Sequence, residues 1–140
     1  MNQVAYNYKI EKIIASVMII TGGLIYVLYR PPSLLLFRVA DYVGLTPYVE
    51  QIQDNVSYIY MPSFVINSLP AGLWTASYLI FMYINTRFHN RGAKLLLSLP
   101  LPASAIVLEF LQLTEWFPGT FDLWDLVCYI IPMIIFIKSI

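Results

Sequence analysis

The sequence contains very few charged residues. Only 11% of its 140 residues are Asp, Glu, Lys or Arg, whereas 59% are hydrophobic. A soluble domain is about one quarter charged, because charged side chains cover its surface and keep it in solution. This shortage argues against an ordinary soluble domain and predicts an integral membrane protein in contact with the lipid bilayer.

The sequence also has only one cysteine and one histidine, and its net charge is zero. The single cysteine, Cys128, has no partner for a disulfide within the chain, and the single histidine, His89, has no second His or Cys nearby to form a metal site. Acidic and basic residues number eight each, so the composition gives no basic surface for nucleic acid. We therefore expect no nucleic-acid partner, no metal and no cofactor.

Four largely uncharged stretches are long enough to cross a bilayer. In a single all-α domain over residues 1–140, we predict spans at residues 13–29, 62–85, 94–113 and 121–140. Pro70 in the second span is expected to be tolerated, because neighbouring membrane helices satisfy the carbonyl groups that proline frees. Pro100 and Pro102 are expected to kink the third span.

Residues 33–55 are a different kind of segment, because four charged residues interrupt their apolar pattern. This pattern predicts one or two amphipathic helices that lie on the outer membrane surface between the first and second spans. Gly44 is placed to end the first helix, and Pro47 suits the first turn of the second.

Basic residues are distributed unevenly between the two sides of this four-span topology. One side receives six of them: Lys9, Lys12, Arg87, Arg91, Lys94 and Lys138. Only Arg30 and Arg38 fall on the other side. Because loops rich in Lys and Arg stay in the cytoplasm, we expect both termini and the loop around residues 87–94 to be cytoplasmic.

Polar residues gather near the outer ends of three predicted spans. Glu109 and Gln112 are three residues apart, as are Asp122 and Asp125, so each pair shares a helix face. At a rise of about 1.5 Å per residue, Asn67 falls at a similar depth, roughly 7 Å inside the outer end of its span. A charge inside a bilayer costs roughly 3 kcal/mol. We therefore expect these five residues to line an outward-facing ligand pocket.

Some of these residues also have a purely structural interpretation. Asp122 follows a Pro-Gly-Thr sequence and can cap the fourth span, with Asp125 near the positive end of that helix. Asn67 can form a hydrogen bond between helices. Glu109 has no such role, because an anion is disfavoured near the C-terminal end of its own helix.

The same residues resemble a signature of VanZ-like bacterial membrane proteins. Residues 109–112 read EFLQ and residues 118–126 read PGTFDLWDL, which resembles an E-x-x-Q motif, a short loop and D-x-x-D-L at the head of the last span. The stretch NSLP from Asn67 resembles an asparagine-to-proline segment of the family. The resemblance covers roughly residues 67–133. It implies a compact four-span bundle in the bacterial inner membrane, with a role in the cell envelope.

The chain also departs from the pattern of that family. The family often has an arginine in the loop before the aspartates, where Gly119 or Thr120 stands here. It often has an asparagine and a glycine later in the last span, where Tyr129 and Pro132 stand. The missing loop arginine removes a countercharge that the carboxylates would otherwise have.

Two functions are consistent with these features. The first is an envelope protein whose carboxylate pocket binds a lipid-linked or cationic ligand. The alternative is a small structural or accessory subunit of a larger inner-membrane complex with partner membrane subunits, which the pair Gly22 and Gly23 favours. An enzyme that uses Glu109 or Asp125 as a general base is less well supported, because no nucleophile–base pair has suitable spacing.

Overall fold

The computed structural model describes residues 2–31, 34–114 and 119–140, and within them the regular secondary structure is α-helical. This result confirms the predicted all-α class. The helices are α1 (Asn2–Tyr29), α2 (Leu35–Tyr42), α3 (Thr46–Val56), α4 (Ser63–Asn67), α5 (Leu69–Asn85), α6 (Arg91–Ser98), α7 (Pro100–Leu111) and α8 (Leu123–Ser139).

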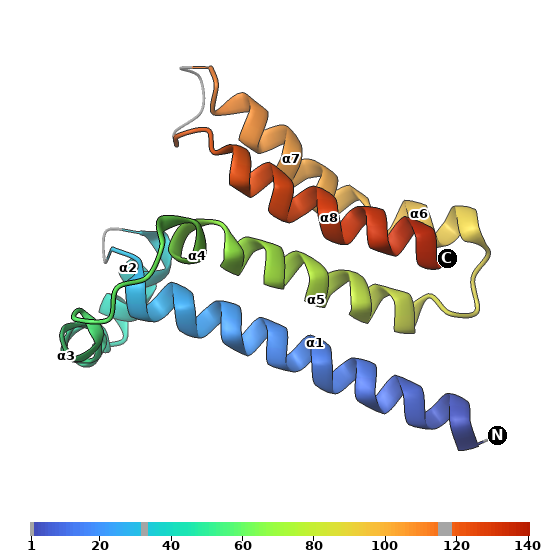
Figure 1. The fold of residues 1–140 in the computed structure, drawn as a ribbon, viewed down its shortest axis with the longest axis horizontal. Helices are drawn as coiled ribbons and strands as arrows, with labels where there is room; N and C mark the ends of the chain where they lie inside the picture. Colours follow the sequence, from blue (N-terminus) through green and yellow to red (C-terminus); the bar gives the residue numbers. More distant parts are fainter. Residues whose placement is uncertain (1, 32–33, 115–118) are drawn as a thin grey trace.

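Helix α5 lies at the centre of the molecule. It packs against α1 on one side and α8 on the other, and α7 packs against α8 (Figure 1). Both chain termini and the α5–α6 connection lie at one end, here called the terminal end (Figure 1). The opposite end, here called the site end, carries α2, α3, α4 and the start of α8 (Figure 1).

A glycine allows α1 and α5 to approach closely. A Cβ atom on Gly22 would lie 2.7 Å from Nε1 of Trp74, so no larger residue fits there without movement. Trp74 Nε1 donates a hydrogen bond to the Ile19 carbonyl at 3.2 Å, and Ser77 Oγ donates one to the Ala15 carbonyl at 2.7 Å. We call these contacts the α1–α5 seam.

A second glycine serves the contact between α5 and α8. A Cβ atom on Gly72 would lie 3.0 Å from Cβ of Cys128, so the two helix backbones are close at this level. The buried side chains of Leu79, Leu126 and Phe136 lie on these same two helices. This packing explains the place of Cys128 as a small residue facing a glycine.

The second and third predicted spans are each divided into two helices. A break at Ser68 separates α4 from α5, so the expectation that Pro70 would be tolerated within one continuous helix is wrong. The reason is that the proline ring clashes with the carbonyl four residues earlier and leaves it without a donor. Helices α6 and α7 meet at Leu99 with a bend of 45°, which confirms the kink expected at Pro100.

The predicted amphipathic segment forms the two helices α2 and α3. Gly44, with φ of 72°, lies between them, and Pro47 stands in the first turn of α3. Gln53 Nε2 donates hydrogen bonds to the carbonyls of Val27 at 2.7 Å and Arg30 at 3.0 Å. These bonds hold α3 against the end of α1. The location of the segment on a membrane surface remains a prediction.

Few of the described helices combine the length and the apolar character that membrane crossing needs. Among the described residues, Tyr8–Tyr29 within α1 is long and apolar enough to cross a membrane, and α6 with α7 gives a second such stretch if the bent pair is one span. The same properties occur in signal sequences and in core helices of soluble proteins. Four spans therefore remain a prediction.

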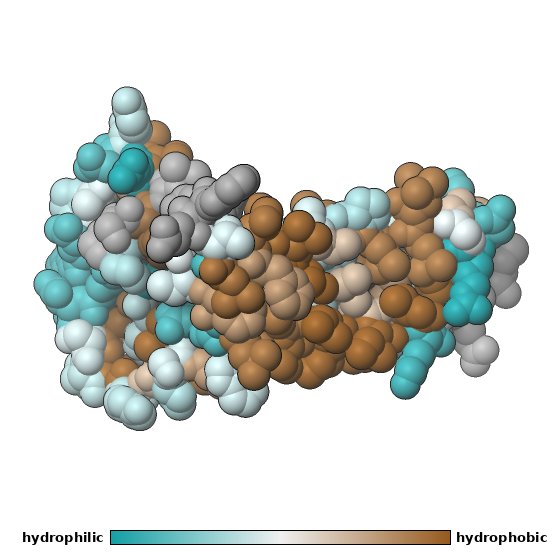
Figure 2. Space-filling view, turned by 90° about the horizontal axis from the view of Figure 1, so that it is seen from above, coloured by the Kyte–Doolittle hydropathy of each residue, from teal (hydrophilic) through white to brown (hydrophobic). Residues whose placement is uncertain are grey.

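The surface between the two ends is strongly apolar. Figure 2 shows hydrophobic residues along the middle of the molecule and hydrophilic residues at both ends. Large aliphatic side chains along the lengths of α1, α7 and α8 are more than half exposed, among them Ile13, Val17, Ile20, Leu24, Leu101, Val107, Ile131 and Ile135.

Candidate functional site

Glu109 is buried in the last turn of α7, with 3% of its surface exposed. Its Oε1 accepts a hydrogen bond from the backbone N–H of Asp122 at 2.7 Å. Because Asp122 is the N-cap of α8, this bond joins the C-terminal end of α7 to the N-terminal end of α8. The carboxylate is disfavoured by its own helix dipole, and the positive end of α8 compensates.

Asp122 has the structural role that its position predicts. Its Oδ1 accepts a hydrogen bond from the Trp124 backbone N–H at 2.9 Å, which satisfies one of the unpaired donors at the start of α8. The backbone N–H of Asp122 therefore joins α8 to α7, and its side chain caps α8.

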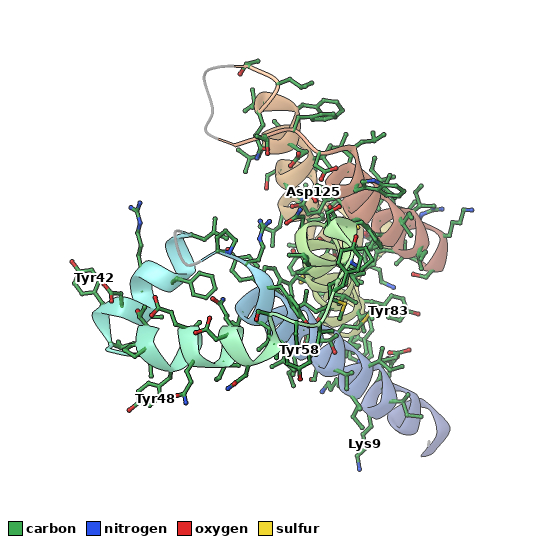
Figure 3. The ribbon with its side chains drawn as sticks, turned by 60° about the vertical axis from the view of Figure 1, so that its left-hand side comes forward. Lys9, Tyr42, Tyr48, Tyr58, Tyr83 and Asp125 are labelled. Atoms are coloured by element: carbon green, nitrogen blue, oxygen red, sulfur yellow. The ribbon has the colours of Figure 1, made fainter. Side chains whose placement is uncertain are left out.

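Asp125 lies in the first turn of α8 and differs from its two acidic neighbours. It lies beside Ser68, at the α4–α5 break, and is within electrostatic range of Arg30. Figure 3 labels Asp125 at the site end. The Ser68 hydroxyl interacts with the Asp125 carboxylate. Among the described residues, however, neither the buried Asp125 Oδ1 nor the buried Ser68 Oγ has a hydrogen bond of good geometry. Leaving such a group unsatisfied costs about 1–3 kcal/mol.

Arg30 is a site residue that the sequence analysis did not identify. Its Nη1 donates a hydrogen bond to Asn67 Oδ1 at 2.7 Å, and its guanidinium lies 5.5 Å from the centre of the Tyr26 ring. Its Nε is buried and has no partner among the described residues. Arg30 supplies a positive charge near Asp125. It follows α1, whereas the VanZ-like signature often has its arginine in the loop before the aspartates.

Gln112 occupies the C-cap of α7 and lies against the connection to α8. A Cβ atom on Gly119 would lie 2.7 Å from Cδ of Gln112, and the φ of 138° at Gly119 also requires glycine. Gln112 therefore packs against this connection. Pro118 of the VanZ-like signature lies outside the described residues.

The site end thus brings together four of the five predicted residues with two others. Asn67, Glu109, Asp122 and Asp125 gather there with Ser68 and Arg30. Within the described parts of the chain, no three His, Cys, Asp or Glu side chains are grouped so that they could hold a metal ion. The arrangement offers a carboxylate oxygen, a hydroxyl and a guanidinium N–H for binding.

Comparison with known proteins identifies no relative of this chain. No model of a protein family, no curated protein and no solved structure matches the chain. The VanZ-like resemblance therefore remains a prediction from its short motifs.

Proposed function

We propose that this chain is a bacterial inner-membrane protein whose site end faces outward and binds the polar head of a lipid-linked ligand. One observation carries the proposal. Among the described residues, three buried polar atoms from three segments, Arg30 Nε, Ser68 Oγ and Asp125 Oδ1, have no hydrogen bond of good geometry, although the Ser68 hydroxyl lies beside the Asp125 carboxylate. Unsatisfied groups that gather at one end of a helix bundle are expected where a ligand completes the hydrogen bonding.

The exposed apolar surface supports the membrane location. Aliphatic side chains exposed along α1, α7 and α8 would associate in water, whereas lipid tails solvate them. Helices α5 and α8 have 17 residues each, which corresponds to roughly 26 Å and is close to the thickness of a hydrocarbon core. Four spans are then α1, α4–α5, α6–α7 and α8, which agrees with both termini lying at one end (Figure 1).

The charges at the site end indicate the chemistry of the head group. Arg30 offers a donor that suits a phosphate or another acceptor, because guanidinium groups bind phosphate well. Asp125 accepts from a hydroxyl or an ammonium group, and Ser68 can do either. A head group that carries both an acceptor and a donor would satisfy all three. A lipid tail would place this head at the bundle end, beside the apolar surface of the helices.

The proposal is tested by a matched pair of substitutions in α8. Asp125→Asn removes a carboxylate without a hydrogen-bond partner at Oδ1, whereas Asp122→Asn keeps the helix cap, since Asn caps as well as Asp. Native mass spectrometry of the chain purified from bacterial membranes should detect a co-purified lipid in the wild type and in Asp122→Asn. Asp125→Asn should lose it. Equal lipid content in all three proteins would contradict the proposal.

A second function, a subunit of a larger membrane complex, is favoured by one observation. Among the long helices, α1 packs only against α5, so much of its apolar surface is exposed. A partner helix could cover that surface. In this case the chain purified in mild detergent should carry another polypeptide in fixed ratio, and it should aggregate when produced alone. A stable, monodisperse chain without a partner would argue against the subunit function.

A further inference from the structure

An apolar groove lies at the terminal end, away from the polar cluster described above. Its volume is about 510 Å³, and its walls come from α1, α5 and α8. Helices α1 and α8 flank α5 (Figure 1), and all three contribute lining residues to the groove. Each helix contributes residues from one face, such as Ala76, Leu79 and Tyr83 of α5, at spacings of three and four.

One charged side chain stands among these apolar walls. Glu11 lines the groove with Ile14 and Met18 of the same helix face. Glu11 Oε2 is buried and has no hydrogen-bond partner among the described residues. Glu11 lies nearest the terminal end, whereas Met18 lies roughly 10 Å deeper along α1. The groove therefore has a carboxylate at its mouth and an apolar interior.

A cation lies near the same mouth. Tyr83, labelled in Figure 3, forms part of the wall, and Lys94 Nζ of α6 lies 5.6 Å from the centre of its ring. The groove thus has an anion from α1 in its wall, and a cation from α6 lies beside the Tyr83 ring, outside the lining residues. An occupant that places an ammonium beside Glu11 and a phosphate towards Lys94 would complement both charges.

We propose that this groove binds an acyl chain of a phospholipid of the cytoplasmic leaflet, with the ammonium of its head group paired with Glu11. The apolar walls suit an acyl chain, and the Glu11 carboxylate, whose Oε2 has no hydrogen-bond partner among the described residues, suits an ammonium group. The inference rests on the membrane location in the proposed function and concerns the opposite end of the bundle.

The test uses two lipids that differ in the head group. The wild-type chain in detergent is incubated with equal amounts of phosphatidylethanolamine and phosphatidylglycerol of the same acyl composition, and bound lipid is counted by native mass spectrometry. Phosphatidylethanolamine should be retained about fivefold more, the ratio expected from one partly exposed ion pair. Glu11→Gln should abolish this preference. Equal retention by the wild type, or a preference unchanged in Glu11→Gln, would overturn the inference.

A second variant tests the apolar part of the groove. Ala76→Phe fills the groove and should reduce retention of both lipids, whereas Leu96→Phe, on the exposed surface of α6 outside the groove, should not. Equal retention in these two variants would also contradict the inference. A second copy or another polypeptide held in place of lipid would assign the groove to a protein partner instead.

Two controls distinguish an error in the groove assignment from an error in the proposed membrane location. Asp125→Asn should keep the lipid preference, because Asp125 lies at the other end of the molecule. Flotation of the chain with phospholipid vesicles reports membrane insertion itself. A chain that floats without any head-group preference would disprove the groove assignment and leave the membrane location intact. A chain that does not float would disprove both.

Discussion

The α1–α5 seam and the site end differ in the hydrogen bonding of their buried serine side chains. In the seam, Ser77 is 0% exposed and its hydroxyl donates to the Ala15 carbonyl. At the site end, Ser68 is also 0% exposed, but its hydroxyl has no partner among the described residues. The serine of the seam helps to hold two helices together, whereas the serine of the site end makes no hydrogen bond of good geometry with the described residues. Such groups are expected where a ligand binds.

The largest loss of stability is expected from a substitution that forces α1 and α5 apart at the seam. Gly22→Leu should destabilise the chain by about 3 kcal/mol, because even a Cβ there would contact Trp74 at 2.7 Å. Gly23→Leu is the control, because a Cβ on Gly23 has no neighbour within 4 Å. Thermal unfolding in detergent should separate the two variants clearly. Equal midpoints would show that α1 does not pack on α5 in this way.

The hydrogen bond between α7 and α8 is expected to be the strongest polar contribution at the site end. Glu109→Ala should cost about 2 kcal/mol, because it leaves the Asp122 backbone N–H without its acceptor. Glu109→Gln keeps an acceptor oxygen at the same position and should recover most of that loss. If both variants lose the same stability, the charge of Glu109 matters to the fold and its hydrogen bond does not.

The two buried serines give the most direct contrast between seam and site end. Ser77→Ala should cost about 1 kcal/mol, because a hydrogen bond in the seam is lost. Ser68→Ala should cost less than Ser77→Ala, because the Ser68 hydroxyl makes no hydrogen bond of good geometry and loses only its interaction with the Asp125 carboxylate. The same unfolding assay measures both. A larger loss for Ser68→Ala than for Ser77→Ala would remove the distinction on which the ligand site depends.

The sequence predicted where the helices lie better than where they are interrupted. Hydropathy located the long helices, and Gly44 and Pro47 marked the junction of α2 and α3 because both residues restrict local backbone geometry. The sequence did not predict the break at Ser68. Membrane helices often tolerate a proline, but here the ring of Pro70 clashes with the carbonyl four residues earlier.

The sequence predicted part of the candidate site and missed its positive charge. Spacing placed Glu109 and Asp125 at one level, because helix rise is regular. The sequence gives Arg30 a role only in the predicted topology, although the structure places it beside Asn67. Its hydrogen bond to Asn67 depends on how α1 packs beside α4, and no local pattern encodes that contact. The groove beside Glu11 likewise depends on three helices meeting.

The orientation of the bundle in a membrane is the central claim, and cysteine labelling tests it most directly. In a Cys128→Ala background, single cysteines replace Asp54 in α3 and Asn90 before α6, which lie at opposite ends of the molecule. A membrane-impermeant maleimide applied to intact bacterial cells, freed of outer-membrane barriers, should label the cysteine at position 54. The cysteine at position 90 should react only after the cells are opened. Labelling of position 90 from outside, or of both positions alike, would contradict the account.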